Sequence, residues 1–322
     1  MAIRSCLYRA DAVDLEVDLD ATVLAGLNER QLLWVDVAAP QDGEIDRVAA
    51  LFRLSPAALR VPPHPHRPSI ENYGPCFRIA VYAVLDGNGD PCKPLPLTLV
   101  AGDNFVISVH AGNLPFIEEL RRREKGDTKL GELTAESFVA SLLDWQLSTY
   151  FHAVERLEHE VDEVEVAVLG RRQTSGFLRR MVRARQEISE LRRLLKPHRD
   201  VFYGLARPDF TATERPEAKP HFTALIAHFE RAEDALESAR DLVVGSFDLF
   251  ATRAAQRTNE TMRVLTFVTV LMGSLSLIAG VMGMNFGLPF FETGERGFWQ
   301  VMGLMSIVVA IALGVGRWRR WY

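Results

Sequence analysis

A stripe of small and polar side chains runs along the C-terminal half of the chain at alternating steps of four and three residues. This spacing keeps its members on one face of a helix. Carboxylates and an amide come first, an apolar section follows, and hydroxyls and glycines end the stripe. Rings of carboxylates attract cations and apolar constrictions close a pore, so this order favours a cation pathway. The members are Asp241, Gly245, Asp248, Thr252, Ala255, Asn259, Met262, Thr266, Thr269, Gly273, Ser276, Gly280 and Gly283, with Leu265 beside Met262.

The same face has a second interpretation, because small residues at this spacing also let membrane helices pack closely. Two features favour the pathway. The face carries Asp241, Asp248 and Asn259 where a packing seam would be apolar, and the intervening positions of the later section are large and apolar. A membrane-anchored coiled-coil scaffold or sensor that conducts nothing is a further alternative, but it requires an apolar seam at 241–259 that the sequence lacks.

Two uncharged segments must position this stripe. Residues 264–284 and 298–316 contain no Asp, Glu, Lys or Arg. As helices they would be roughly 32 and 28 Å long, close to the thickness of a bilayer's hydrocarbon core. Buried helices of a soluble core are the alternative, but two such segments in succession favour transmembrane helices. Two spans cannot enclose a pore by themselves, so a pore would require several copies in a ring.

The charges that flank the two segments predict their orientation. Three arginines precede the first segment and three follow the second, whereas the connection 285–297 carries Glu292, Glu295 and only Arg296. Excess arginine on both outer ends places both termini in the cytoplasm and the connection outside. Aromatic residues near the ends would anchor the helices at the interfaces. The arginines are Arg253, Arg257, Arg263, Arg317, Arg319 and Arg320, and the aromatic residues are Trp299, Trp318, Trp321 and Tyr322.

Averages over the 322 residues conceal these segments. The chain has 37 Lys and Arg against 42 Asp and Glu, a net charge of −5 and 48% hydrophobic residues. This balance excludes a generally basic nucleic-acid binder. The three cysteines are far apart and lack Cys-x-x-Cys spacing, which excludes a disulfide framework or zinc knuckle and indicates a reducing compartment. The first 20 residues contain no apolar run long enough for a signal peptide.

The remaining patterns predict three regions: a cytoplasmic α/β domain at 1–130, a helical hairpin with a long pore helix at 131–263, and a transmembrane domain at 264–322. The last consists of spans 264–284 and 298–316, the external loop 285–297 and a basic cytoplasmic tail 317–322. The predicted strands are 31–37, 76–85, 97–100 and 105–110, and the predicted helices of the first domain are 44–52 and 115–123.

Three long helices follow from the placement of glycine and proline. The first runs from an N-cap at Thr134 towards Gly170, and the second from Phe177 to Pro197, as an antiparallel hairpin. The third begins near Pro220 and meets no further proline before the membrane, so one helix covers about 64 residues, 221–284. A helix of this length requires partners in a coiled coil or an oligomer.

The end of the first span carries a specific motif, Gly-Met-Asn at 283–285. Upstream stand Asn-Glu-x-Met-Arg-Val-Leu-Thr (259–266) and Ile-Ala-Gly (278–280). With these motifs the chain resembles the CorA family of divalent-cation channels, whose signature is Gly-Met-Asn at the end of the first of two C-terminal transmembrane helices. The tail 317–322 is similar to the family's ending, and Leu-Trp-Val-Asp (33–36) and the segment 192–200 are similar to shorter pieces of it.

The resemblance implies a funnel-shaped homopentamer with an α/β cytoplasmic domain, a long-helix coiled-coil region and two C-terminal transmembrane helices. It implies influx of Mg²⁺, and also of Co²⁺ or Ni²⁺, with Gly283, Met284 and Asn285 as the selectivity filter. Mg²⁺ sheds its water reluctantly, so the Asn285 amide would contact the hydrated ion through its water shell. Asp248 is a second candidate for metal contact.

The implied partners are further copies of the chain, the bilayer and divalent cations, with no nucleic acid. No cofactor is implied beyond the transported or regulatory Mg²⁺ or other divalent cation. The implied location is the bacterial inner (plasma) membrane, multi-pass, with cytoplasmic termini. Neither a Gly-Lys-Ser/Thr phosphate loop nor a Gly-x-Ser-x-Gly elbow occurs, so an enzyme is not expected. A divalent ion gains roughly 4.6 kcal/mol on entering a cell polarised by about 100 mV, so passive influx is sufficient.

Two departures from the family pattern leave the ion open. Residues 288–291 are Leu-Pro-Phe-Phe in place of the usual Met-Pro-Glu-Leu, and Ser274 stands where a proline is common. Glu292 and Glu295 could supply the missing external charge. The zinc-transporting ZntB branch also lacks Met-Pro-Glu-Leu, so ZntB-like Zn²⁺ transport is the alternative function.

Two histidine groups could in principle bind metal. His64 and His66 lie in a proline-rich stretch, for which a plain loop is the favoured interpretation. His152, Glu155, His159 and Asp162 share one face of the helix from Thr134, but the surrounding glutamates favour a solvated acidic face.

Overall fold

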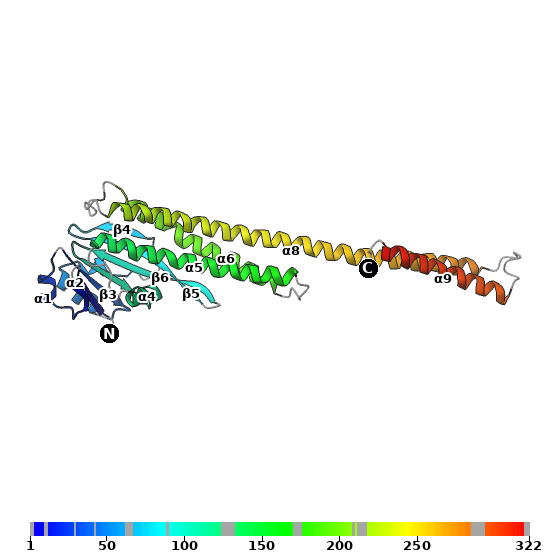
Figure 1. Cartoon of the computed structure of the whole chain (residues 1–322), viewed down its shortest axis with the longest axis horizontal. Helices are drawn as coiled ribbons and strands as arrows, with labels where there is room; N and C mark the ends of the chain where they lie inside the picture. The colour runs from blue at the N-terminus through cyan, green and yellow to red at the C-terminus, as the bar shows by residue number, and fades with distance from the viewer. Residues whose placement is uncertain are drawn as a thin grey trace. The chain divides into compact units, whose positions relative to one another are not determined.

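A computed structural model describes residues 3–9, 12–28, 30–41, 43–61, 67–87, 90–123, 133–169, 176–207, 210, 218–284 and 294–318 (Figure 1). The chain divides into two compact units, Met1–Gly245 and Ser246–Tyr322. The finer division of the chain at residues 130 and 263 stays a prediction.

The first unit is built on a seven-stranded sheet with the strand order β2-β1-β3-β7-β6-β5-β4. Among the described strands, β3 and β7 are parallel and the other neighbours are antiparallel. The four strands predicted from sequence are confirmed, with β5 and β6 longer at their shared turn. The bounds are β1 Ile3–Arg9, β2 Ala12–Glu16, β3 Gln31–Ala38, β4 Ser69–Asn72, β5 Phe77–Gly87, β6 Asp90–Ala101 and β7 Phe105–His110.

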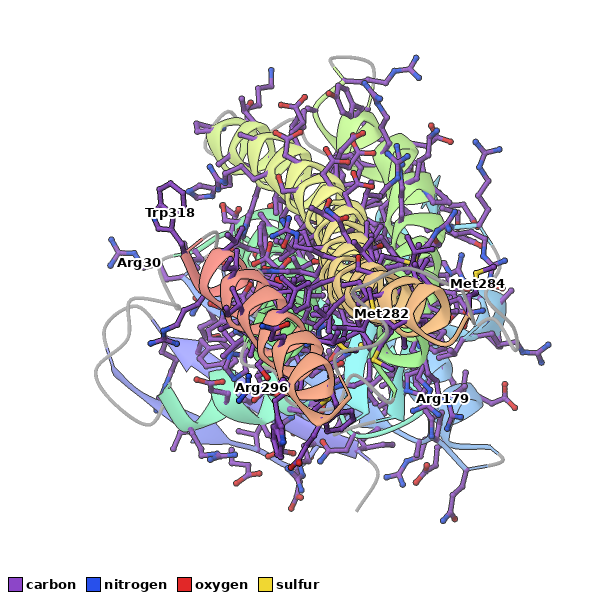
Figure 2. The ribbon with its side chains drawn as sticks, turned by 90° about the vertical axis from the view of Figure 1, so that its right-hand side faces the viewer. Arg30, Arg179, Met282, Met284, Arg296 and Trp318 are labelled. Atoms are coloured by element: carbon purple, nitrogen blue, oxygen red, sulfur yellow. The ribbon has the colours of Figure 1, made fainter. Side chains whose placement is uncertain are left out.

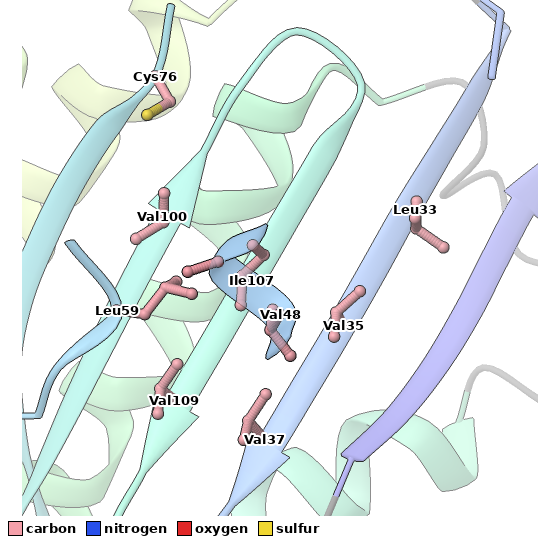
Figure 3. Packing of buried hydrophobic residues seen from close by; sticks show 10 residues of the cluster. Leu33, Val35, Val37, Val48, Leu59, Cys76, Val100, Ile107 and Val109 are labelled. Carbon is pink, nitrogen blue, oxygen red and sulfur yellow. The ribbon is translucent and has the colours of Figure 1, made fainter. Parts of the chain in front are cut away.

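Helices cover both faces of the sheet. Leu33, Val35 and Val37 of β3 point to one face and pack with α2 (Glu44–Phe52) and α3 (Pro56–Leu59), as Figure 3 shows. The short helix α1 (Ala21–Ala25) lies on the same face. Trp34 points to the other face, where its ring lies 5.3 Å from that of Phe138 in α5. The predicted helices at 44–52 and 115–123 (α4, Pro115–Arg123) are confirmed.

A buried polar network joins the parallel strands β3 and β7 to α4. Asp36 lies at its centre, with its carboxylate accepting a hydrogen bond from Ser108 Oγ (2.5 Å) and lying 3.1 Å from His110 Nε2. Arg121 of α4 donates to the same carboxylate at 3.3 Å and lies over the Trp34 ring. The Leu-Trp-Val-Asp segment therefore serves the core of this unit, because its aspartate satisfies two buried polar partners, Ser108 and His110, and the partly buried Arg121.

We expect Asp36→Ala to lower the free energy of unfolding by about 3 kcal/mol, because breaking a buried ion pair leaves its partners uncompensated. In a unit of this size that corresponds to a fall in melting temperature of roughly 10 °C. Thermal unfolding of the full chain in detergent, followed by tryptophan fluorescence, measures this change. Asp103→Ala removes an exposed carboxylate and is the control. Equal melting temperatures for both variants would contradict the role of the network.

Two helices form the predicted antiparallel hairpin, α5 (Ala135–Leu169) and α6 (Phe177–Leu195). Thr134 caps α5, since its Oγ1 accepts a hydrogen bond from Ser137 N–H at 3.2 Å. Ion pairs between the two helices show the antiparallel pairing, as Arg156 contacts Glu187 and Glu163 contacts Arg180. The acidic segment of α5 thus lies partly against the arginine-rich α6.

The outer edge of β5 is closed by side chains rather than by a strand. β4 pairs with β5 only as far as Ala80. Beyond it, Tyr82 N–H donates to His198 Nε2 at 2.9 Å and Val84 N–H donates to Thr149 Oγ1 at 3.0 Å. His198 belongs to the turn η2 (Lys196–His198), which leads into α7 (Arg199–Leu205). His198 is fully buried, so this turn fixes the hairpin to the sheet.

His198 makes the first unit sensitive to acid. Burial lowers the pKa of His198 from 6.5 to about 4, although hydrogen bonds to Leu194 and Leu195 oppose the shift. As the pH falls, His198 therefore becomes protonated near pH 6.5 in the unfolded chain but only near pH 4 in the folded chain. The free energy of unfolding that depends on neutral His198 is fully present above pH 6.5. It falls by up to about 1.4 kcal/mol per pH unit as the pH is lowered from 6.5 to about 4.

We expect His198→Gln to flatten the dependence of melting temperature on pH between 6.5 and 4, because a glutamine amide accepts the Tyr82 hydrogen bond but does not titrate. The comparison uses melting curves of the full chain across this range. His152→Gln, at an exposed position of α5, should retain the slope of the parent protein. If the melting temperatures of the parent and of the His198 variant fell in parallel with pH, His198 would not be the group whose protonation destabilises the first unit.

The long helix α8 spans Lys219–Met282, and its 64 residues match the predicted length with a shift of two positions. In the first unit it buries an apolar stripe against the helices α5 to α7, and the tilted rings of Phe229 and Phe202 have centroids 5.2 Å apart. The members of this stripe are Phe222, Leu225, Phe229, Ala232, Leu236, Ala239 and Val243. The repeat of three and four residues is that of a coiled coil.

The second unit consists of the remainder of α8 and of α9 (Glu295–Trp318). Both helices are long and apolar enough to cross a membrane, and none of the most apolar window of either is buried. This exposure argues against the alternative of buried core helices. α9 begins three residues before the predicted span, so Glu295 stands in its first turn, where a carboxylate complements the helix dipole.

Candidate functional site

The side chains between the two apolar helices show which face of α8 is occupied within the subunit. Along α8, only one row of apolar side chains between residues 264 and 284 is partly buried, and a matching row lies on α9. We call this contact the α8–α9 seam. Its members are Phe267, Leu271, Leu275, Ile278 and Met282 on α8, and Gly297, Val301, Met305, Val308, Val309, Ala312 and Gly316 on α9.

The small polar face lies on the opposite side of α8. We use this name for Thr266, Thr269, Gly273, Ser276 and Gly280, which are all exposed in the subunit. At 100° per residue, its mean direction lies about 180° from that of the α8–α9 seam. Figure 2, viewed along the helices, agrees, since Met282 of the seam points towards α9 and Met284 points away from it. Packing within the subunit therefore leaves this face uncovered.

The threonines of this face present oxygen atoms as acceptors. Thr266 Oγ1 donates its hydrogen to Met262 O, and Thr269 Oγ1 donates to Leu265 O, each at 2.8 Å. With the hydrogen engaged by the helix, the free lone pairs of each oxygen point outward. Such a surface suits a cation or the hydrogens of its water shell.

The other predicted residues lie earlier on α8. Asp241 of the first unit is 72% exposed, and Asp248, Thr252 and Asn259 of the second unit are also exposed. Met262 and Leu265 are 55% and 59% exposed. Every residue from Ala251 to Thr266 is exposed, so this part of α8 has no covering element among the described residues.

The end of the site beyond α8 is described in part. Gly283 N–H donates to Ala279 O at 2.9 Å and Met284 N–H to Val281 O at 3.2 Å, so the chain completes a last turn beyond α8. Met284 is 51% exposed. Asn285 and Glu292 lie outside the described residues, and Glu295 is exposed at the start of α9.

The histidine groups do not gather into a metal site where the structure describes them. Within the described residues no group of three or more His, Cys, Asp or Glu side chains is placed to hold a metal ion. The His159 Nε2 atom lies 3.6 Å from a carboxylate oxygen of Glu163 on α5. His64 and His66 lie outside the described residues.

One structural residue and one row of packing residues were not singled out from the sequence. His198 falls within the segment 192–200, but only its contact with Tyr82, 116 positions away, gives it a role. The α9 row of the seam was also missed, because the other side chains of α9 are apolar as well and the steps of three and four from Gly297 to Gly316 do not stand out in the sequence.

An α/β unit whose last helix leads into two exposed helices, both long and apolar enough to cross a membrane, is typical of a membrane protein with two spans. A profile of the family described as CorA-like Mg²⁺ transporter protein matches residues 29–315. The chain therefore belongs to the CorA-like family. This is a family of divalent metal-ion transporters and not of enzymes.

Individual relatives agree with this assignment. YfjQ of Bacillus subtilis is 27% identical over 278 residues, which cover 86% of this chain and 85% of that protein. The cobalt/magnesium transport protein CorA of Thermotoga maritima is 25% identical over 294 residues, covering 89% and 83%. The structure of the CorA magnesium transporter from Methanocaldococcus jannaschii superposes with a TM-score of 0.74 at 20% identity, covering 98% of each chain, which shows the fold.

Proposed function

We propose that this chain forms a homopentameric channel that admits divalent cations, most favourably Mg²⁺ and also Co²⁺ or Ni²⁺. The observation that carries the proposal is the position of the small polar face opposite the α8–α9 seam. In a ring of copies with α9 outward, this face would line the central axis. The spans would cross the inner (plasma) membrane with both termini in the cytoplasm.

The proposed pathway has three sections. Asp241, Asp248, Thr252 and Asn259 form a polar approach whose carboxylates attract cations. Met262 and Leu265 form an apolar constriction that closes by dewetting. The small polar face then offers acceptor oxygens to a hydrated ion, up to the proposed filter at Gly283, Met284 and Asn285.

Zn²⁺ transport is a second candidate, favoured by the Leu-Pro-Phe-Phe sequence at residues 288–291. This segment lacks the carboxylate that a Mg²⁺ channel of this family usually carries outside the filter. Glu292 and Glu295 would provide the external charge if the ion is Mg²⁺.

A flux comparison tests the proposal. The full chain is reconstituted into liposomes, and uptake of Mg²⁺, Co²⁺ and Zn²⁺ is followed with and without a proton gradient. We expect Mg²⁺ uptake that depends on membrane potential but not on the proton gradient. Uptake of Zn²⁺ alone, driven by protons, would support the second candidate, and no flux from well-folded oligomers would support a non-conducting scaffold.

A further inference from the structure

A cleft of about 740 Å³ lies in the first unit, beside the strand β1 and the helix α2. The start of β1 and the segment 16–19 form one side of this cleft, and α2 forms the other. Pockets of this size accommodate small organic molecules. We call this feature the α2 cleft. Its lining residues are Ile3, Arg4, Ser5, Glu16, Val17, Asp18, Leu19, Glu44, Arg47, Val48 and Leu51.

Ser5 is a buried polar residue of the α2 cleft that has no partner for its side chain. It pairs in register with Val35, and directly paired residues of neighbouring strands point to the same face of a sheet. The Ser5 side chain therefore points to the face on which Val35 and Val48 lie (Figure 3). Ser5 is only 5% exposed, and its hydroxyl makes no hydrogen bond with any described residue. Because buried hydroxyls are normally hydrogen-bonded, this one is available to a ligand.

Two opposite charges of α2 line the same cleft without pairing. Glu44 and Arg47 are three positions apart, so they lie on one side of the helix. In the described part of the chain neither forms an ion pair, with the other or with a third residue. One carboxylate oxygen of Glu44 accepts a hydrogen bond from Gln41 N–H at 2.7 Å, which leaves the other oxygen open. The cleft thus offers both an acceptor for a cation and a donor for an anion.

The remaining lining residues determine the balance of charge and the apolar surface. Glu16 and Asp18 are exposed carboxylates, so the lining is acidic apart from Arg47. Arg4 adds no free charge, because its guanidinium is paired with Glu118 of α4 at 2.9 Å. The apolar lining residues also pack on the core beneath α2, and they are Ile3, Val17, Leu19 and Val48.

We propose that the α2 cleft binds a zwitterion with an apolar body, of the class of large apolar α-amino acids. Arg47 holds the carboxylate through paired hydrogen bonds, and Glu44 accepts hydrogen bonds from the ammonium group. Ser5 supplies a further hydrogen bond, and the apolar lining covers the side chain of the ligand. A simple carboxylate would be repelled by the acidic lining, and a simple amine would leave Arg47 unpaired. The proposal concerns the first unit and does not require that the protein conducts ions.

Isothermal titration calorimetry of the full-length protein in detergent tests this binding with three probes that share one apolar body. Leucine carries both charges, isocaproate lacks the ammonium group, and isoamylamine lacks the carboxylate. We expect leucine to bind at least about tenfold more tightly than either single-charge probe, because each charged group gains its own hydrogen bonds. No heat of binding with leucine at millimolar concentration, or equal affinity for the three probes, would overturn the proposal.

Variants of α2 test the role of each charge. Arg47→Gln should weaken leucine binding at least about tenfold while leaving the affinity for isoamylamine unchanged, since this probe has no carboxylate. Arg53→Gln is the matched control, because Arg53 follows the same helix and does not line the cleft. Glu44→Gln should weaken leucine binding, whereas Asp46→Asn, also in the first turn of α2 but outside the cleft, should not. Parent affinity for leucine in the Arg47 variant would overturn the assignment, and melting curves establish that each variant is folded.

Discussion

Replacing Gly273 with leucine is expected to stop ion transport while leaving the subunit folded. Gly273 is the middle residue of the small polar face, and a Cβ atom added there meets no other atom within 4 Å. The subunit can therefore accommodate the larger side chain. In a ring of copies, however, each subunit would add an isobutyl group to the same narrow level of the pathway. Apolar constrictions of this kind exclude water and ions.

We expect the flux of Mg²⁺ through liposomes to fall by about two orders of magnitude, which corresponds to a barrier raised by roughly 3 kcal/mol. Gly280→Leu should act in the same way, because this position also has open space and belongs to the same face. The matched control is Gly303→Leu on α9. Its Cβ would likewise meet nothing within 4 Å, but Gly303 lies on the side of α9 away from the seam.

The flux measured for Gly273→Leu tests whether the small polar face lines the ion pathway. If the leucine variant folds and assembles like the parent and its flux is unchanged, the small polar face does not line the route of the ion. If Gly303→Leu blocks flux as strongly, the effect belongs to helix packing and not to the pathway. Melting curves recorded beside the flux confirm that each variant is folded.

The long helices could be predicted because their signals are local. Pro220 stands at the start of α8 and no later proline interrupts it, so the predicted helix 221–284 differs from the observed one by two residues at each end. Thr134 likewise predicted the start of α5, because threonine is a common N-cap residue and its hydroxyl caps this helix. Apolar length predicted both membrane helices, since this signal depends on composition alone.

The edge strands of the sheet could not be predicted with the same ease. β1 and β2 mix charged and apolar residues, and β4 has only four residues. Their pairing depends on neighbours in space, as β1 lies between β2 and β3. Strand propensity depends strongly on such context. The burial of Asp36 and His198 has the same origin, because their partners lie 72 to 116 positions away in the chain.

The sequence predicted which residues form the small polar face of α8, but not whether this face points towards α9 or away from it. The spacing from Thr266 to Gly280 identified one small polar face, yet the same pattern is compatible with a packing seam. What distinguishes the two is the position of α9, whose residues are apolar on nearly every side and give little directional signal. Because Phe267, Leu271 and Leu275 occupy the face towards α9, the small polar face is free to meet other copies.

Loss of the Asn285 amide is the second change expected to have a large effect. We expect Asn285→Ala to reduce Mg²⁺ uptake at least about tenfold, equivalent to about 1.4 kcal/mol or more in the barrier. An amide oxygen can accept hydrogen bonds from the waters of a hydrated ion, whereas a methyl group cannot. Growth of a Mg²⁺-uptake-deficient bacterium that expresses the variant measures the loss. Ser306→Ala is the control, because it also replaces a polar side chain with a methyl group but lies on α9, where its hydroxyl donates only to Met302 O of the same helix.

Asn285→Asp distinguishes recognition of the water shell from simple attraction of charge. A ring of carboxylates would attract a divalent ion more strongly than a ring of amides, because each adds a negative charge at short range. If the amide serves to bind the ion loosely, the aspartate variant should saturate at lower Mg²⁺ concentration and conduct more slowly at saturation. Liposome flux measured over a range of Mg²⁺ concentrations separates these two effects. Full growth rescue by Asn285→Ala, or faster saturated flux in Asn285→Asp, would place the selective step elsewhere along the pathway.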